Sequence, residues 1–330
     1  MHGQETIVRY LQDAEAAERN FEDALEAFSN MGDQTFVQRA LRMMSAKAKT
    51  QHEKLETRLK ELGAGPSTAK SALAHILGFA PTAAQMGQSD SEKNTQHLIA
   101  TIAAAAAETA MYQALGIAAH AAHDVDTQQL AEHLQQDELE DYRIAAGLLR
   151  ESALDSFHRS SMDKQEALKA YLQDAIAAEK NFETQLRGFA KEGSGNEIHA
   201  LFLQHADETK RQYERLTRRL EEIGGSPSTA KTFIAHLVGM SPKLGQVGHD
   251  VMDRLTQDLI ITFAVENCEV AMYEALIAVA EAVDDTQSAE LARSIQAEER
   301  ATAEKVWQRL SPTALSAFNK MSGKEELAHR

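Results

Sequence analysis

The sequence predicts an all-α protein that consists of two tandem four-helix bundles. The first observation is composition: alanine, leucine, glutamate and glutamine are abundant, whereas the chain has only five prolines and 5% aromatic residues. Such a mixture favours helix and argues against a β-sandwich. The second observation is size, because 330 residues of which 43% are hydrophobic suffice for two separate cores. The third observation is an internal repeat.

The two halves of the chain repeat each other at an offset of 161 residues, the separation of Tyr10 from Tyr171. Eleven of thirteen residues are identical between YLQDAEAAERNFE, which begins at Tyr10, and YLQDAIAAEKNFE, which begins at Tyr171. The same offset relates the two copies of PSTAK and of AMY. A register that holds over most of both halves indicates a tandem duplication. We therefore expect two domains, residues 1–162 and residues 166–330, joined by a short polar link.

Each half contains four segments whose apolar residues recur with helical spacing. In the second half the first segment carries Leu172, Phe182 and Leu186 on one stripe. The second segment ends at Gly224, a glycine C-cap, with Pro227 shortly after it. The expected helices of the second half cover, in order, about 172–189, 197–223, 255–283 and 288–310.

The connection between the second and third expected helices is long. It covers about 228–248, and Pro242 interrupts it, so we expect one or two short helices there. Ferritin-like bundles are connected by a long crossover at this point. The sequence therefore predicts two ferritin-like four-helix bundles, each with a short-helix crossover between its second and third helices.

Acidic residues and a histidine interrupt the apolar stripes of the second half, near the middle of each helix. In chain order they are Glu179, then His205 and Glu208, then Glu266 and Glu269, and finally Glu298 with Glu299 beside it. Antiparallel packing brings these residues to one level of the bundle. Several carboxylates in one dry layer cannot all stay ionised without a compensating cation. The pattern predicts a pair of iron or manganese ions, with carboxylates that share protons as the alternative.

Four motifs of the second half carry a family resemblance. They are AEKNFETQL, HADETKRQYERL, VENCEVAMYEAL and AEER, which begin at Ala178, His205, Val265 and Ala297. They are similar to the helical motifs of the YciE/YciF-type ferritin-like proteins, which are bacterial stress-associated proteins, and the resemblance extends over most of both halves. It implies a role in oxidative or general stress, and metal ligands at Glu179, Glu208, Glu266, Glu269 and Glu298, with His205 and Glu299 as further candidates. The order His205–Glu208 departs from the Glu-x-x-His of bacterioferritin and rubrerythrin.

The first half keeps two of these carboxylates and loses the others. Glu18 and Glu108 occupy the positions of Glu179 and Glu269. The equivalents of His205, Glu208, Glu266 and Glu298 are Met44, Lys47, Ala105 and Asp137. We therefore expect metal in the C-terminal bundle only, and a structural role for the N-terminal bundle. Lys47 either pairs with Glu18 or Glu108 inside the bundle or extends its ammonium group to solvent.

Charge and apolar pattern exclude several classes of partner. A formal net charge of −16 disfavours nucleic acids and anionic membranes. The single cysteine, Cys268, excludes a disulfide within the chain. The sequence has no run of eighteen apolar residues and no N-terminal signal pattern, so we expect a cytoplasmic protein. The expected partners are metal ions and, in a homo-oligomer, further copies of the chain.

Two functions of different classes fit this sequence. In the first, the chain is a metal-binding protein whose iron or manganese reacts with oxygen or peroxide. In the second, it is a non-catalytic structural or interaction stress protein on a ferritin-like scaffold without metal. The fold alone does not separate them, because function depends on the site. Whether the chain is an enzyme therefore stays open at this stage.

Overall fold

The computed structural model describes residues 2–66, 90–191, 197–227 and 251–323. These residues form eight helices and, within the described ranges, no strand. The first half contains α1 (His2–Ser29), α2 (Thr35–Glu61), α5 (Asp90–Ala122) and α6 (Val125–Arg159). The second half contains α7 (Lys164–Phe189), α8 (Glu197–Glu222), α10 (Val251–Ala282) and α11 (Thr286–Met321). The predicted all-α fold with two tandem helical halves is confirmed, whereas the expected short crossover helices lie outside the described residues.

The helix α11 continues beyond the end that the sequence predicts. We expected a fourth helix ending near Leu310, but α11 runs on through Pro312 to Met321. A proline inside a helix removes a backbone hydrogen bond and costs roughly 3 kcal/mol. Ala314, Ala317 and Phe318, which follow the proline, are all fully buried. Burial of this extra apolar stripe offsets the cost of the proline.

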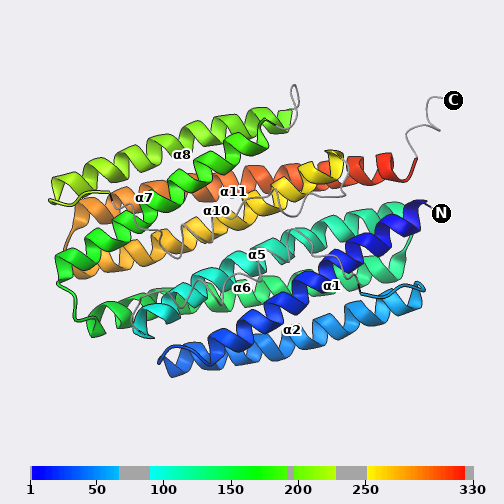
Figure 1. Ribbon diagram of the computed structural model, residues 1–330, viewed down its shortest axis with the longest axis horizontal. Helices are drawn as coiled ribbons and strands as arrows, with labels where there is room; N and C mark the ends of the chain where they lie inside the picture. The colour runs from blue at the N-terminus through cyan, green and yellow to red at the C-terminus, as the bar shows by residue number, and fades with distance from the viewer. Residues whose placement is uncertain (1, 67–89, 192–196, 228–250, 324–330) are drawn as a thin grey trace.

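The two halves share one hydrophobic core. In Figure 1 the hairpin of α5 and α6 lies beside α10 and α11, while α1–α2 and α7–α8 lie on the outer sides. Buried side chains from both halves form a single continuous cluster. Polar contacts also join the halves: the Tyr10 hydroxyl donates to Asp253 Oδ1 at 2.8 Å, and Arg150 pairs with Glu274 and Glu281. The two halves therefore pack directly against each other through this shared core.

The helix α5 lies at the centre of this assembly. Its segment Glu92–Ala122 is long and apolar enough to cross a bilayer, but 94% of the most apolar window is buried inside the protein. A helix that is covered by its own bundle on one side and by the second half on the other must be apolar all round. The composition of this segment is thus that of a central core helix.

Equivalent turns in the two halves are built in the same way. Asp124 caps α6 by accepting from the Thr127 backbone N–H, and Asp285 caps α11 by accepting from the Ser288 backbone N–H. Each capping carboxylate also pairs with an arginine of the second helix of its half, Arg58 at 2.7 Å and Arg219 at 2.8 Å. These capped turns fix the register of the third helix against the fourth, and so the level at which their side chains meet.

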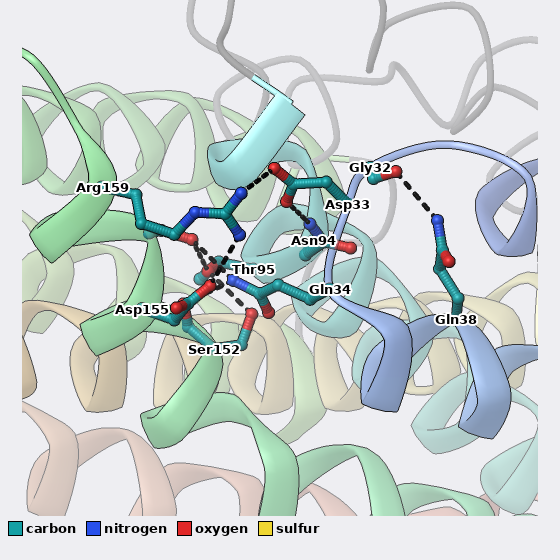
Figure 2. Close-up of polar contacts among 10 residues, drawn as sticks. Gly32, Asp33, Gln34, Gln38, Asn94, Thr95, Ser152, Asp155 and Arg159 are labelled. Atoms are coloured by element: carbon teal, nitrogen blue, oxygen red, sulfur yellow. Dashed lines mark hydrogen bonds and ion pairs between the residues drawn. The ribbon is translucent and has the colours of Figure 1, made fainter.

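A polar network closes one end of the N-terminal bundle (Figure 2). Arg159 at the end of α6 reaches Asp33 at 2.5 Å and Asp155 at 3.2 Å. Gln34, which precedes α2, donates to the backbone carbonyl of Ser152 at 3.1 Å. Asn94 of α5 donates to Asp33 at 3.2 Å. The network ties the α1–α2 turn to α5 and α6.

Candidate metal centre

Four helices of the second half bring ionisable side chains into one buried layer. Glu179 of α7, Glu266 and Glu269 of α10 and Glu299 of α11 are each 0% exposed, and His205 of α8 is 2% exposed. His205 Nε2 lies 2.7 Å from Glu266 Oε1. Ligand atoms of His205, Glu266 and Glu299 lie within 4.8 Å of one another. We call these five residues the C-terminal layer.

Neutral side chains hold two carboxylates of this layer in place. The Tyr273 hydroxyl donates to Glu179 Oε1 through a short hydrogen bond. Gln212 Nε2 donates to Glu299 Oε1 at 2.5 Å. Within the described part of the chain, neither oxygen of Glu269 has a hydrogen-bond partner, and the second oxygens of Glu179 and Glu299 have none either. Buried carboxylate oxygens without donors are costly, and a cation among them removes that cost.

Burial and mutual repulsion perturb the protonation of the C-terminal layer. Burial raises the pKa of Glu179 to about 8, although the hydrogen bond from Tyr273 and the nearby His205 oppose the shift. Burial, together with Glu179 and Glu266, raises the pKa values of Glu269 and Glu299 well above the usual range. Burial opposes protonation of His205, but Glu266 and other nearby carboxylates outweigh it and raise the His205 pKa to about 9. Without a cation, the layer therefore takes up protons near neutral pH.

Two of the residues expected in the centre lie at its edge. Glu298 is exposed and pairs with Arg215 at 2.7 Å. Glu208 Oε2 lies 3.8 Å from His205 Nδ1, beyond hydrogen-bond distance, and the nearby His205 lowers the Glu208 pKa to about 2. Helical spacing allows either the third or the fourth residue after Ile295 to continue its buried stripe. In α11 the fourth residue, Glu299, is buried in the bundle, and the third, Glu298, is exposed. Glu208 is close enough to orient His205, and Glu298 faces Arg215.

The first half contains a corresponding buried cluster. Glu18 of α1, Glu108 of α5 and Glu138 of α6 are fully buried, and their ligand atoms lie within 4.8 Å of one another. The Tyr112 hydroxyl donates to Glu18, and Gln51 donates to Glu138 at 2.8 Å. Glu138 was not expected from the sequence, because Glu298 and not Glu299 was the preferred α11 ligand and its equivalent is Asp137; the same offset relates Glu299 to Glu138. We call these three carboxylates the N-terminal layer.

Lys47 pairs with a partner that the sequence analysis did not consider. Its ammonium nitrogen lies 2.5 Å from Asp141 Oδ1 and 3.3 Å from Glu140 Oε2, and it donates to the Asp137 carbonyl at 3.1 Å. Lys47 therefore pairs with neither Glu18 nor Glu108; its ammonium group reaches out of the layer, as in the second alternative, but ends on α6 carboxylates at the edge, one buried and one exposed. Asp141 stands one helical turn beyond Glu138 on α6, so it meets the lysine at the edge of the layer. Burial raises the Asp141 pKa to about 6, against the lowering effect of Lys47.

The two layers differ in their suitability for metal. The C-terminal layer offers four carboxylates and an imidazole, a nitrogen and oxygen donor set that suits iron, manganese and zinc. Four carboxylates carry the charge that two divalent ions balance. The N-terminal layer offers three carboxylates and no imidazole, and burial raises the Glu138 pKa to about 8. Both layers contain buried carboxylate oxygens without hydrogen-bond partners among the described residues, so the donor set, with its imidazole and fourth carboxylate, is what makes the C-terminal layer fit a metal pair better.

Comparison with known proteins gives two findings. The sequence model of the family described as "Domain of unknown function (DUF892)" matches residues 3–152 and again residues 163–318. Among solved structures, a protein from Xanthomonas campestris pv. campestris is 28% identical to this chain, with a TM-score of 0.39. The match covers 48% of this chain and 96% of that protein.

Proposed function

This chain belongs to the DUF892 family, in two tandem copies, and we propose that it binds a pair of iron or manganese ions in the C-terminal layer. The observation that carries the proposal is the burial of four carboxylates and one imidazole, from four helices, around oxygens that accept no hydrogen bond. Desolvating several like charges together costs several kcal/mol per group. A fold keeps such an arrangement when a cation repays that cost.

Each residue of the C-terminal layer has a role in this proposal. Glu266, Glu269, Glu299 and Glu179 are the carboxylate ligands, and His205 is the nitrogen ligand. Tyr273 orients Glu179 and Gln212 orients Glu299, in the manner of the groups that support metal ligands in other proteins. His205 must release a proton before it coordinates, and the Glu208 carboxylate, 3.8 Å from its other ring nitrogen, electrostatically favours a proton on that nitrogen.

The chemistry of the bound ions connects the site to a physiological role. An iron or manganese pair supplies one-electron redox chemistry toward oxygen or peroxide. The buried layer keeps bulk water away, and Tyr273 places a phenol beside a ligand carboxylate. Together with the resemblance to the YciE/YciF-type proteins, this supports a role in oxidative or general stress.

The competing proposal is a metal-free scaffold. It is favoured by one observation, the N-terminal layer, in which burial raises the pKa values of Glu18, Glu108 and Glu138 so that buried carboxyl groups persist in the protonated form. If the C-terminal layer persists in the same way, the chain serves as a structural or interaction protein. The two proposals differ in how stability responds to metal.

Thermal melting with and without metal separates these proposals. The test variant is Glu179→Gln/Glu269→Gln, and the matched control is Glu18→Gln/Glu108→Gln, which changes the equivalent residues of the other half. Anaerobic Fe(II) should raise the melting temperature of the wild type and of the control relative to EDTA, by linkage of about 2.7 kcal/mol at a hundredfold excess over the Kd. It should not shift the test variant. Equal responses from all three proteins would favour the scaffold.

A further inference from the structure

A histidine on the α1–α2 side of the first half faces three carboxylates outside both buried layers. His52 Nε2 lies 3.0 Å from Glu15 Oε1 and 3.6 Å from Glu56 Oε1. His52 Nδ1 lies 3.2 Å from Glu22 Oε2. Ligand atoms of Glu15, His52 and Glu56 lie within 4.8 Å of one another. One ring nitrogen therefore meets two carboxylates, while the other meets a third.

We propose that Glu15, His52 and Glu56 form a zinc site, with Glu22 orienting the imidazole. A tetrahedral zinc ion with bonds of about 2.0–2.1 Å separates its ligand atoms by about 3.3 Å, and the two separations from His52 Nε2, 3.0 and 3.6 Å, lie on either side of that value. The ring nitrogen opposite the metal commonly donates to a carboxylate, which fixes the tautomer, and Glu22 is in that position. Three protein ligands leave a fourth position for water.

A second observation at the same place comes from Glu15. Its side chain is fully buried, and its Oε2 has no hydrogen-bond partner in the residues that the structure describes. A buried carboxylate with an unpartnered oxygen is costly. The other oxygen of the same carboxylate, Oε1, faces His52, so a cation held between Glu15, His52 and Glu56 lies beside the unpartnered Oε2 as well. A cation at that position satisfies the buried oxygen from the side that solvent can reach.

Two cations already lie near the proposed site, and neither blocks it. Arg19 Nη1 lies 3.2 Å from Glu15 Oε1, but the arginine side chain is 43% exposed and can turn to solvent. Lys60 pairs with Glu56 Oε2 at 2.9 Å, which leaves Oε1 toward His52. The Lys60–Glu56 pair is solvent-exposed and therefore weak, and a bound zinc ion would take the place of the Arg19 charge beside the buried Glu15 carboxylate.

The second half lacks this arrangement, although it repeats the surrounding helices. Its residues at the three ligand positions are Ile176, Tyr213 and Thr217, none of which suits zinc. There Lys180 lies over the Tyr213 ring, 5.3 Å from its centroid. The proposed zinc site thus belongs to the first half alone. It is also independent of the metal pair proposed for the C-terminal layer.

Calorimetric titration with zinc chloride at pH 7 tests the proposal on the full chain. The background is Glu179→Gln/Glu266→Gln/Glu269→Gln, which removes three of the four carboxylates of the C-terminal layer, so the result does not depend on whether that layer binds metal. We expect one zinc-binding event that disappears in His52→Gln and in Glu15→Ile, which introduces the residue found in the other half. Glu22→Gln should weaken binding by about 10–100-fold, the range for residues that orient ligands. His133→Gln is the matched control, because His133 is an exposed α6 histidine that faces one carboxylate, Asp137.

The outcomes divide cleanly. Zinc binding that depends on His52 and Glu15 but not on His133 supports the site. Absence of binding, or binding that survives both His52→Gln and Glu15→Ile, overturns it and leaves His52 as the centre of a surface ion-pair network. A second substitution, His52→Tyr, also introduces the residue of the other half. Circular dichroism melts of all variants identify any substitution that prevents folding. If His52→Gln prevents folding, the zinc titration of His52→Tyr takes its place.

Discussion

The two buried layers of this chain share one arrangement of helices and differ at four positions, two inside the layer and two at its edge. Both keep a glutamate that accepts from a tyrosine and a glutamate that accepts from a glutamine: Glu179 and Glu299 in the second half, Glu18 and Glu138 in the first. Both also keep the glutamate of the third helix, Glu269 or Glu108. Inside the layer His205 stands against Met44 and Glu266 against Ala105, and at the edge Glu208 stands against Lys47 and Thr302 against Asp141.

These differences change where the ion pair of each half lies and how many carboxylates its layer contains. In the second half the imidazole of His205 and the carboxylate of Glu266 meet deep inside the layer, 2.7 Å apart. In the first half apolar side chains replace that pair, and the ion pair is moved to the edge, between Lys47 and Asp141. The N-terminal layer thus lacks the nitrogen donor and one carboxylate of the C-terminal layer. Protons alone can neutralise its three remaining carboxylates. The comparison teaches that one scaffold can hold a buried carboxylate cluster in two ways.

The largest expected effect is on the pH dependence of the metal-free chain. Glu179 and Glu138 have pKa values raised from 4.5 to about 8, and His205 has one raised from 6.5 to about 9. Folded protein therefore binds more protons than unfolded protein across this range, so the free energy of unfolding falls as pH rises. We expect urea denaturation in EDTA to show a loss of several kcal/mol between about pH 5 and pH 9.

Metal and variants sharpen this prediction. Saturating metal should remove the part of the pH dependence that comes from the C-terminal layer, because the bound ligands are already deprotonated. Glu179→Gln/Glu269→Gln should reduce the dependence, and Glu18→Gln/Glu108→Gln should reduce it through the other layer. A metal-free chain whose stability is flat or rises from pH 5 to pH 8 would show that the buried carboxyls do not hold protons.

A smaller effect is expected at the edge of the N-terminal layer. Lys47→Met leaves the buried Asp141 carboxylate without its partner, which costs roughly 3–5 kcal/mol for a fully buried pair. Because the Lys47 side chain is 25% exposed, we expect less, about 1–2 kcal/mol. Adding Asp141→Thr, the residue at the equivalent position 302, should restore most of the loss. Urea denaturation of Lys47→Met, of Asp141→Thr and of the double variant measures the loss of stability and its recovery.

The double-mutant cycle decides what the pair contributes. Coupling near zero between Lys47 and Asp141 would mean that the ion pair is solvated and that the N-terminal layer is stable without it. Coupling of about 1 kcal/mol or more would mean that the pair compensates for the imidazole and carboxylate that this half lacks.

The fold and part of the site were predictable from sequence for identifiable reasons. Helical periodicity and the 161-residue repeat indicate the helices and the duplication directly. Glu179, Glu266 and Glu269 interrupt otherwise apolar stripes, so their burial at one level follows from antiparallel packing. His205 is placed by the same pattern.

Other features of the site depend on helix rotation and side-chain reach, which the spacing of apolar residues in the sequence does not determine. Glu298 and Glu299 stand three and four residues after Ile295, and both spacings fit a helical stripe, so only the rotation of α11 selects Glu299. The partner of Lys47 depends on how far a flexible side chain reaches across to α6. The cluster around His52 joins residues of two helices that are polar and lie beside the apolar stripe, where sequence gives no signal of convergence.

Metal content of the purified chain tests the central claim most directly. Wild type, Glu179→Gln/Glu269→Gln and Glu18→Gln/Glu108→Gln should be purified without added metal or chelator, and iron and manganese measured by mass spectrometry. We expect about two ions per chain in the wild type and in the N-terminal variant, and almost none in the C-terminal variant. Metal that is absent from all three proteins, or that is lost with the N-terminal substitutions, would contradict the assignment of the metal centre to the C-terminal layer.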